Sequence, residues 1–362
     1  MSQKAIPFLM MRGGTSRGLY FGRTDLPENR DRLAQVLIAA VGSGHRYNID
    51  GLGGGVAVTT KVAMLSRSAD PKADIDYFFA QVSVTEQRVD FRPTCGNILS
   101  GVGPAAIEMG LIRAEAPMTR VRIRAVNTGA LVDAVIQTPD WRVTYDGDLA
   151  IDGVPGTSAP VQLNFRETVG SITGMLTPTG KVRDLIDEVE VTCLDVAMPV
   201  VIARAESFGL TGTESLEGLD ANTDFIARRE AIRIKAGALM GMGDVSASVT
   251  PKFAIMAPGR NGGAASARYF MPQACHPSMA VTGAQCLAAS LLVPGSVTHG
   301  LAQAASSPAQ LVLEHPSGSI DIMVEYAAAD QDRPLMLHSA GIMRTARLLA
   351  RGEVMIPASV WP

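Results

Sequence analysis

The apolar positions of this chain follow two periods, and together they predict an ordered series of elements. Residues 31–44 (DRLAQVLIAAVGSG) carry apolar side chains at helical spacing and end in glycines, which predicts an amphipathic helix. The glycine-rich stretch 49–55 (IDGLGGG) predicts a loop. The run TTKVAML is apolar around Lys61, and we expect a strand there.

The second half of the chain repeats this order. Residues 224–243 (DFIARREAIRIKAGALMGMG) predict another amphipathic helix, and a strand-like run follows around Lys252. The segment T-K-V-A-M at 60–64 thus parallels P-K-F-A-I at 251–255. The parallel predicts that the chain consists of two copies of one structural unit.

Each copy continues with a segment that is apolar on nearly all sides, at 93–112 and at 274–295. A helix that is hydrophobic all round is buried inside a larger structure. The β-branched and aromatic runs around it would supply the surrounding sheet. We therefore expect two pseudo-symmetric domains, 1–185 and 186–362, each of strands wrapped about a central buried helix.

Composition and charge exclude several classes of protein. Hydrophobic residues make up 47% and charged residues 19% of the 362 positions, so the chain can form a core and is not disordered. The net charge of −3 offers no electrostatic footprint for nucleic acid, and no basic run suits a membrane surface. The N-terminal apolar stretch is too short for a signal peptide, and no run of about 18 apolar residues occurs. We expect a cytoplasmic protein that binds neither nucleic acid nor membrane.

The cysteines and histidines do not form a recognisable framework. Four cysteines scattered over the chain are too few for a disulfide scaffold. No C-x-x-C pair occurs and no two of the five histidines stand at i, i+4, which excludes the commonest zinc sites.

Three glycine motifs match well-known patterns only in part. Residues 14–18 fit G-x-S-x-G, but so near the start nothing upstream can supply the oxyanion loop of a hydrolase. Residues 101–106 fit a relaxed G-x-G-x-x-A, but Pro104 interrupts it, and residues 51–56 lack the G-K-[ST] ending of a P-loop. We expect a tight turn close to an anion at 14–18 and packing glycines in a buried helix at 101–106.

Lys61 is the first candidate for chemistry, because it sits inside an apolar run where burial of a lysine is costly. A desolvated amine has a lowered pKa and is a neutral base that can take a proton from carbon. The alternative is an ordinary outward-facing lysine on an alternating strand. Lys252 at the equivalent repeat position competes for the same role, and the repeat does not choose between them.

Two cysteines mark the expected starts of the central helices. Cys95 precedes Gly96 and Asn97, and Cys275 opens the second segment. Helix N-termini offer free amides and the positive end of the dipole, which suit carboxylates and enolates, and they lower the pKa of a thiol. Two ordinary buried cysteines are the alternative.

These stretches resemble the PrpF family of isomerases, and the resemblance covers almost the whole chain. Its matching motifs are MRGGTSRG at 11–18, IDGLGGG at 49–55, TTKVAML at 59–65, CGNILSGVGP at 95–104, IDGVPGTSAPV at 151–161, GDVSASVTPK at 243–252, RYFMPQACHPSMAVTGA at 268–284, EHPSGSIDI at 314–322 and MRTARLLARGEV at 343–354.

The resemblance implies an α+β, diaminopimelate epimerase-like fold of two pseudo-symmetric domains, each a curled, mainly antiparallel sheet around a central buried helix, with the active site in the cleft between them. Family members move a double bond within unsaturated tricarboxylates and need neither a metal nor an organic cofactor. The family lysine matches Lys61 and the family cysteine matches Cys95. The parent epimerases use two cysteines, whereas this chain has Cys275-His276-Pro277 at the second place, which favours one base acting at two carbons.

We therefore expect a cofactor-independent 1,3-allylic isomerase or tautomerase with Lys61 as the base and Cys95 as an acid or a wall of the pocket. The favoured substrate is 4-oxalomesaconate, from gallate or protocatechuate degradation, with aconitate or 2-methylaconitate as the alternative. An amino-acid racemase or epimerase and a non-catalytic carboxylate-binding paralogue also stay open, and a homodimer is considered as the assembly. The expected substrate-binding residues are Arg12, Thr15, Ser16, Gly96, Asn97, Arg268, Ser278 and Thr282.

Overall fold

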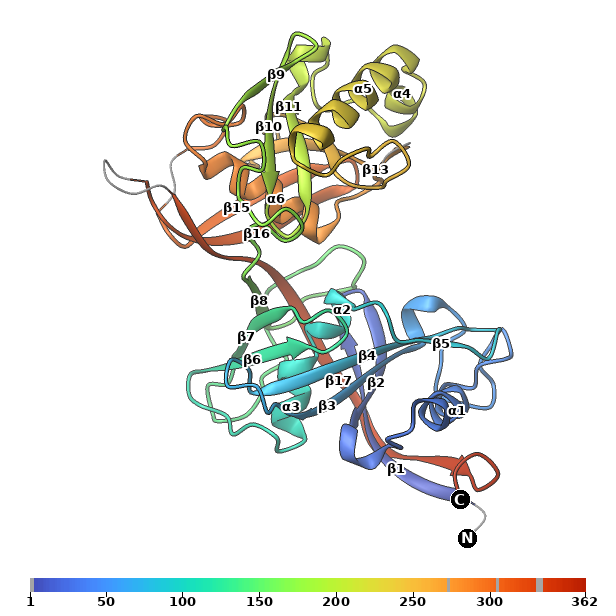
Figure 1. The fold of residues 1–362 in the computed structure, drawn as a ribbon. Helices are drawn as coiled ribbons and strands as arrows, with labels where there is room; N and C mark the ends of the chain where they lie inside the picture. Colours follow the sequence, from blue (N-terminus) through green and yellow to red (C-terminus); the bar gives the residue numbers. More distant parts are fainter. Residues whose placement is uncertain (1–2, 272–273, 304–305, 330–334) are drawn as a thin grey trace. The chain divides into compact units, whose positions relative to one another are not determined.

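The chain divides into two compact units, which are described here one at a time (Figure 1). The computed structural model describes residues 3–271, 274–303, 306–329 and 335–362. Unit 1 contains residues 1–164 and 343–362, and unit 2 contains residues 165–342. These bounds differ from the expected 1–185 and 186–362, because the C-terminal strand pairs with the first strand of the chain.

Unit 1 is built on one mixed sheet. Its strands are β1 (Gln3–Gly13), β2 (Ser16–Gly22), β3 (Lys61–Arg67), β4 (Ile75–Val82), β5 (Val89–Asp90), β6 (Met118–Ala125), β7 (Leu131–Gln137), β8 (Pro160–Arg166) and β17 (Met336–Pro357). The sheet runs β7, β6, β4, β3, β2, β1, β17, with β5 added beside β4 and β8 beside β17. The pairs β2–β3 and β4–β6 are parallel, and the other registered pairs in this unit are antiparallel.

Unit 2 repeats this arrangement. Its strands are β9 (Asp184–Ile186), β10 (Val189–Asp195), β11 (Pro199–Arg204), β12 (Lys252–Pro258), β13 (Ala265–Met271), β14 (Ala274–Cys275), β15 (Ala309–His315) and β16 (Gly318–Ala327). The sheet runs β9, β10, β11, β12, β13, β15, β16 and ends on the first part of β17. The parallel pairs are β11–β12 and β13–β15, which stand at the places of β2–β3 and β4–β6. The pairing order therefore supports two copies of one unit, and Lys61 and Lys252 each begin the equivalent strand.

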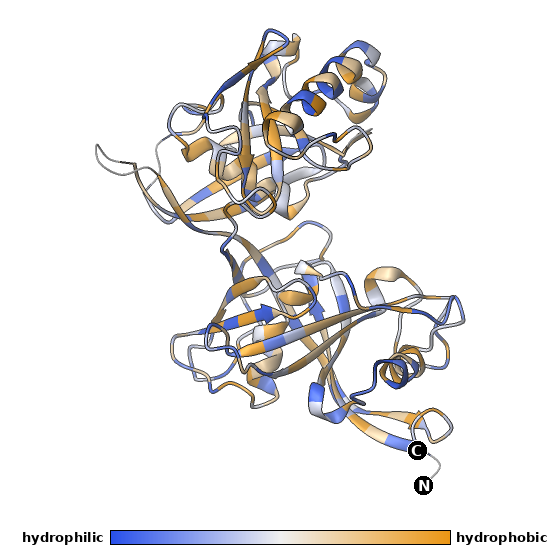
Figure 2. Cartoon of the chain, viewed as in Figure 1, coloured by the Kyte–Doolittle hydropathy of each residue, from blue (hydrophilic) through white to orange (hydrophobic). Residues whose placement is uncertain are grey.

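The amphipathic helices form where the apolar spacing predicts them. They are α1 (Arg30–Val41) and α5 (Thr223–Leu239), with the short α4 (Leu216–Asp220) before α5 and single turns at Arg23–Asp25, Ala57–Thr59 and Ala205–Phe208. The Asn29 side chain caps α1 by accepting from the Arg32 amide, and Gly42 ends the helix with a left-handed φ of 75°. Figure 2 shows hydrophilic and hydrophobic residues alternating along α5, whose apolar face packs into the core of unit 2.

The central helix of unit 1 is broken, which the apolar pattern did not indicate. It consists of α2 (Gly96–Leu99) and α3 (Val102–Glu108), separated at Ser100 and Gly101. Pro104 has no amide hydrogen to donate to the carbonyl of Ser100, and its ring crowds that carbonyl, so one continuous helix cannot form. Gly101 and Gly103 are packing glycines, as predicted: a Cβ on Gly101 would lie 2.4 Å from the Tyr20 hydroxyl.

The central helix of unit 2, α6 (Val281–Leu292), is buried on all sides from Gly283 to Leu291. It does not begin at Cys275, as the sequence suggested. Cys275 lies in β14, paired with Phe270 of β13. The residue before a proline favours extended backbone, so His276-Pro277 delays the helix until Val281. With this correction, the predicted α+β fold of sheets around buried central helices is confirmed.

Candidate functional site

The structure brings the two expected catalytic residues into direct contact. Lys61 is the first residue of β3, and Cys95 is the residue immediately before α2. The Lys61 Nζ atom lies 3.3 Å from the Cys95 Sγ atom, and both residues are half-buried. The amine also stands 5.6 Å from the centre of the Phe79 ring. An amine and a thiol at this distance can pass a proton between them and to a bound molecule.

Two buried tyrosines hold the backbone around Cys95. The Tyr77 hydroxyl donates to the Cys95 carbonyl at 3.3 Å, and the Tyr20 hydroxyl donates to the Ile98 carbonyl at 2.6 Å. Burial, with the neighbouring Cys95, raises the pKa of both tyrosines well above the ordinary value of 10, so they remain donors. Neither tyrosine was expected from the sequence, where an aromatic residue near apolar neighbours is the only signal.

The hairpin turn between β1 and β2 docks on α2. The Asn97 amide group donates to the Thr15 hydroxyl at 2.9 Å. A Cβ on Gly13 would lie 2.4 Å from the Asn97 carbonyl, and Gly14 has a φ of 50°, so both positions favour glycine. The glycines of this motif therefore bring the turn against the helix that carries Cys95.

Gly96 faces open space, since no atom lies within 4 Å of where its Cβ would be. A ligand can therefore approach the backbone next to Cys95 closely. The helix that follows has only four residues, so its dipole is weaker than the long helix expected from the sequence would give.

Arg12, Thr15 and Ser16 come together at a pocket of about 400 Å³ inside unit 1. The other residues that line it are Arg17, Thr59, Gly153, Val154, Pro155, Thr157, Ser158, Arg347 and Leu349. Neither Lys61 nor Cys95 lines this pocket. The sequence analysis missed Arg17 and Arg347, although both lie in motifs that it singled out.

Arg12 is anchored by uncharged acceptors. Its Nη1 donates to the Gly14 and Thr345 carbonyls and to the Thr345 hydroxyl, and its Nη2 donates to the Ser158 hydroxyl at 3.1 Å. Burial, and then the charge of Arg347, lower the pKa of Arg12 from its ordinary value.

The remaining expected binding residues belong to unit 2. Arg268 is buried on β13 and donates to the backbone carbonyls of Glu214 and Ala267, and burial lowers its pKa. Ser278 precedes α6, and its amide donates to His276. Thr282 lies in the first turn of α6.

The other three cysteines and Lys252 differ from the Lys61–Cys95 pair. Burial raises the pKa of Cys275 to about 11 and those of Cys193 and Cys286 to about 12. Burial, and then Arg233, lower the pKa of Lys252. In the part of the chain that the structure describes, Lys252 makes no hydrogen bond to a thiol.

Metal-binding clusters and membrane-spanning helices are absent from the described residues. Among residues 3–271, 274–303, 306–329 and 335–362, no group of three histidine, cysteine or acidic side chains is placed to hold a metal ion. The helices within the same residues are all too short or too polar to cross a membrane.

Comparison with known proteins gives matches along the whole chain. The family described as PrpF protein matches residues 3–357. "Putative isomerase YbhH" of Escherichia coli (strain K12) is 49% identical over 98% of this chain and 100% of its own length. The 4-oxalomesaconate tautomerase of Pseudomonas putida is 44% identical over 100% of this chain and 99% of its own length. The crystal structure of methylitaconate-delta-isomerase superposes with a TM-score of 0.90 and 32% identity, over 99% of this chain and 97% of that one.

Proposed function

This chain belongs to the PrpF family and is an isomerase, and we propose that it moves a double bond within an unsaturated tricarboxylate, with 4-oxalomesaconate as substrate. The choice of 4-oxalomesaconate is supported by the 44% identity to a tautomerase of that name over the full length of both chains. Aconitate and 2-methylaconitate remain the alternatives, since a 2-methyl-aconitate isomerase of Shewanella oneidensis is 30% identical over 96% of this chain.

The contact between Lys61 and Cys95 is the observation that carries the proposed chemistry. The lone pair of the Lys61 amine takes a proton from the carbon next to the double bond, and the electrons of that C–H bond form a delocalised dienolate. The resulting ammonium returns a proton two carbons away, and the double bond migrates. The ammonium returns one of its three protons, which exchange with solvent, so one proton is removed and one is replaced and the reaction needs no other reactant.

Cys95 has a defined part in this scheme. The Lys61 amine donates a hydrogen bond to the Cys95 sulfur at 3.3 Å, which orients the amine and leaves its lone pair free to take the substrate proton. The tyrosine bonds to the carbonyls of Cys95 and Ile98 keep the sulfur beside Nζ.

The carboxylates of the substrate need donors near the reacting atoms. We assign this role to the backbone beside Gly96, where space is open, and to Asn97 with Thr15. Contacts from Ser16, Arg268, Ser278 and Thr282 stay predictions. The expected substrate contact of Arg12 also stays a prediction, and Arg12 lines the pocket that includes neither Lys61 nor Cys95. The absence of a metal requirement stays a prediction as well.

The first test is isomerisation by the purified chain in deuterated water, followed by NMR with 4-oxalomesaconate, cis-aconitate and trans-aconitate in parallel. We expect movement of the double bond with deuterium incorporation, fastest for 4-oxalomesaconate. Faster turnover of an aconitate would replace the substrate assignment. Deuterium exchange at a stereocentre of an amino acid without double-bond movement would indicate a racemase instead.

The second test compares Lys61→Met with its matched control, Lys252→Met, at the equivalent position of unit 2. Loss of a general base costs roughly 10²–10⁴ in rate, so we expect Lys61→Met to lose at least 100-fold and Lys252→Met to stay near the parent. A Lys61→Met protein as fast as the parent overturns the base assignment. If Cys95→Ser alone abolishes turnover, the cysteine is the base.

A further inference from the structure

Three arginines form a continuous row across adjacent strands of unit 1. Arg12 on β1 is registered opposite Arg17 on β2 and opposite Arg347 on β17. Side chains directly opposite each other share one face of a sheet and have Cβ atoms about 4.5–5.5 Å apart. The row therefore places the Cβ atoms of three arginines within roughly 10 Å on one face.

The row lies on the opposite sheet face from the Lys61–Cys95 pair. Met10 and Leu19, two residues before Arg12 and two after Arg17, pack into the cluster formed with α1. Gly13, the neighbour of Arg12, turns instead toward Asn97 of α2. Since successive residues alternate between faces, Arg12 and its partners belong to the α1 side. On β3, Val62 and Met64 pack on that side, so Lys61 points the other way, toward Cys95.

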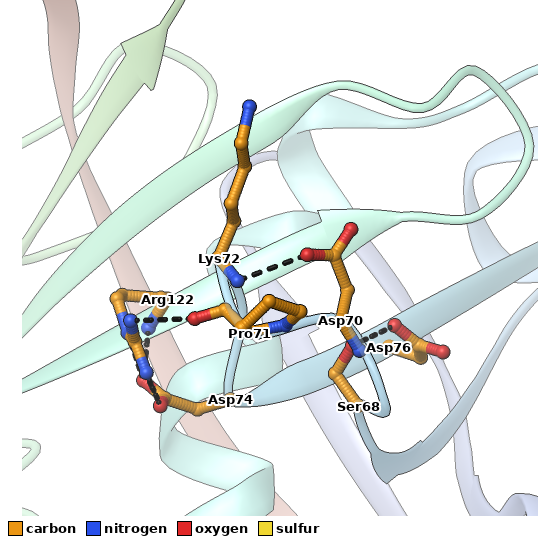
Figure 3. A network of polar contacts seen from close by, with 7 residues as sticks. All are labelled: Ser68, Asp70, Pro71, Lys72, Asp74, Asp76 and Arg122. Carbon is orange, nitrogen blue, oxygen red and sulfur yellow. Dashed lines mark hydrogen bonds and ion pairs between the residues drawn. The ribbon is translucent and has the colours of Figure 1, made fainter.

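No carboxylate neutralises this row within the described residues. Arg12 bonds only uncharged oxygens, and neither Arg17 nor Arg347 forms an ion pair there. Elsewhere on the sheet the same residue type is paired: Arg122 on β6 binds Asp74 and the Pro71 carbonyl (Figure 3), and Arg124 binds Asp76. Like charges directly opposite each other destabilise a sheet, so an unpaired row implies a negatively charged occupant.

The surroundings of the row have the form of a small-molecule site. Arg12, Arg17 and Arg347 all line the pocket of about 400 Å³, together with apolar groups of Val154, Pro155 and Leu349. Gly54 makes room for the row, because a Cβ there would lie 2.5 Å from the Arg17 Nη2. Guanidinium groups bind carboxylates through paired hydrogen bonds, and the apolar lining suits a carbon skeleton.

We propose that Arg12, Arg17 and Arg347 form a second binding site, for a small molecule with two or more carboxylates, separate from the atoms that react. The row is distinct from the reacting pair, because the two lie on opposite faces of β1–β3 and the pocket includes neither Lys61 nor Cys95. Thr15, in the turn between β1 and β2, lines the pocket and also contacts Asn97 on the side of the reacting pair. Its ligand bridges at least two of the three guanidinium groups.

The test is calorimetric titration with citrate at low ionic strength. We compare the parent with Arg17→Gln, Arg347→Gln and Lys61→Met, and with the matched control Arg122→Gln, whose arginine already has a carboxylate partner. We expect the parent to bind citrate. Arg17→Gln and Arg347→Gln should each raise the Kd for citrate at least 10-fold, whereas Lys61→Met and Arg122→Gln should leave the Kd within 2-fold of the parent value. Absence of citrate binding in the parent overturns the proposal, as does equal weakening by Lys61→Met or by Arg122→Gln.

Thermal unfolding gives a second readout that does not depend on detecting heat. Without anion, Arg347→Gln should have a higher Tm than the parent, because repulsion is relieved, whereas citrate should raise the Tm of the parent by more than it raises the Tm of Arg347→Gln. A lower Tm of Arg347→Gln without anion, together with an unchanged response to citrate, contradicts the site. Tighter binding of inorganic pyrophosphate than of citrate would overturn the assignment to carboxylates.

Discussion

The thiol of Cys95 is set apart from the other cysteines by its surroundings. It is half-buried and lies beside an amine, whereas Cys193, Cys275 and Cys286 are buried. Burial disfavours the thiolate, and it is the thiolate that reacts with alkylating reagents. Reactivity of the four thiols therefore reports directly on the environment of the proposed catalytic pair.

We predict that iodoacetamide modifies Cys95 alone in the native protein at pH 8. The pKa values of about 11 for Cys275 and about 12 for Cys193 and Cys286 leave almost no thiolate at that pH, and burial blocks the reagent. Peptide mass spectrometry after limited labelling measures the extent at each site. The Cys95→Ser variant is the control, and labelling of Cys275 at a rate equal to that of Cys95 would contradict the burial argument.

Individual residues could be predicted where one side chain is out of place in its local pattern. Lys61 inside an apolar run is such a case, and Cys95 beside glycine and asparagine is another. Tyr20 and Tyr77 could not be found, because an aromatic residue on a strand indicates a face but not the carbonyl that its hydroxyl meets. Arg347 was missed because its pairing with Arg12 joins opposite ends of the chain.

At the scale of elements, a buried carboxylate organises the loop between β12 and β13. Glu314 on β15 accepts from the backbone amides of Arg260, Asn261 and Gly263, at 3.0, 2.6 and 2.9 Å to its Oε1. Burial acts to raise the pKa of Glu314, but these amides lower it by more, so the pKa is below its ordinary value of 4.5. The charged form is thus favoured by folding.

We predict that Glu314→Gln lowers the free energy of unfolding by about 1.5–3 kcal/mol at pH 7, the usual worth of hydrogen bonds to a charged group. Since the folded pKa is depressed, this stability is present above pH 4.5 and is lost as the pH falls through the folded pKa. Urea unfolding should therefore show a difference between parent and variant that shrinks below pH 4.5.

Asp321→Asn is the matched control, because that carboxylate accepts one side-chain bond, from Gln310, on the neighbouring strand. We expect Asp321→Asn to lower the free energy of unfolding by less than Glu314→Gln does. If the difference in free energy of unfolding between the parent and Glu314→Gln stays constant from pH 7 to pH 3.5, the charge of Glu314 does not contribute to stability.

Elements with a regular spacing of apolar residues could be predicted from the sequence. Features that depend on a single residue could not. The helix at α1 follows from its spacing and its terminal glycines. The break between α2 and α3 depends on Pro104, which the apolar pattern treats as one more buried position. The late start of α6 likewise depends on Pro277, since proline acts on backbone geometry and not on hydrophobicity.

At the scale of the whole chain, the repeat predicted two copies of a unit but not where each copy ends. The strand β17 contributes its residues 343–357 to unit 1, where it pairs with β1 along the entire length of β1. Nothing in the local pattern of residues 343–357 indicates a partner that lies at the other end of the chain. A boundary near residue 185 therefore leaves β17, which pairs with β1 in unit 1, outside the first domain.

The pairing of β17 with β1 leads to a prediction about fragments. A fragment of residues 1–185 leaves β1 with β2 as its only registered partner and exposes the other edge of that strand, which favours aggregation. A fragment of 1–164 joined to 343–362 by a linker of about eight glycine and serine residues restores the β1–β17 pairing. We expect the joined fragment to unfold cooperatively in urea and the 1–185 fragment to aggregate or to unfold without a transition.

The control keeps the length and composition of the joined fragment but replaces Leu348 and Ala350 with proline, because these residues are registered opposite Met11 and Met10. Proline removes a backbone donor and is not accommodated inside a paired strand. If the proline variant unfolds as cooperatively as the joined fragment, the pairing with β17 does not stabilise unit 1. If the proline variant does not unfold cooperatively and the joined fragment does, unit 1 needs the pairing of β17 with β1 in order to fold.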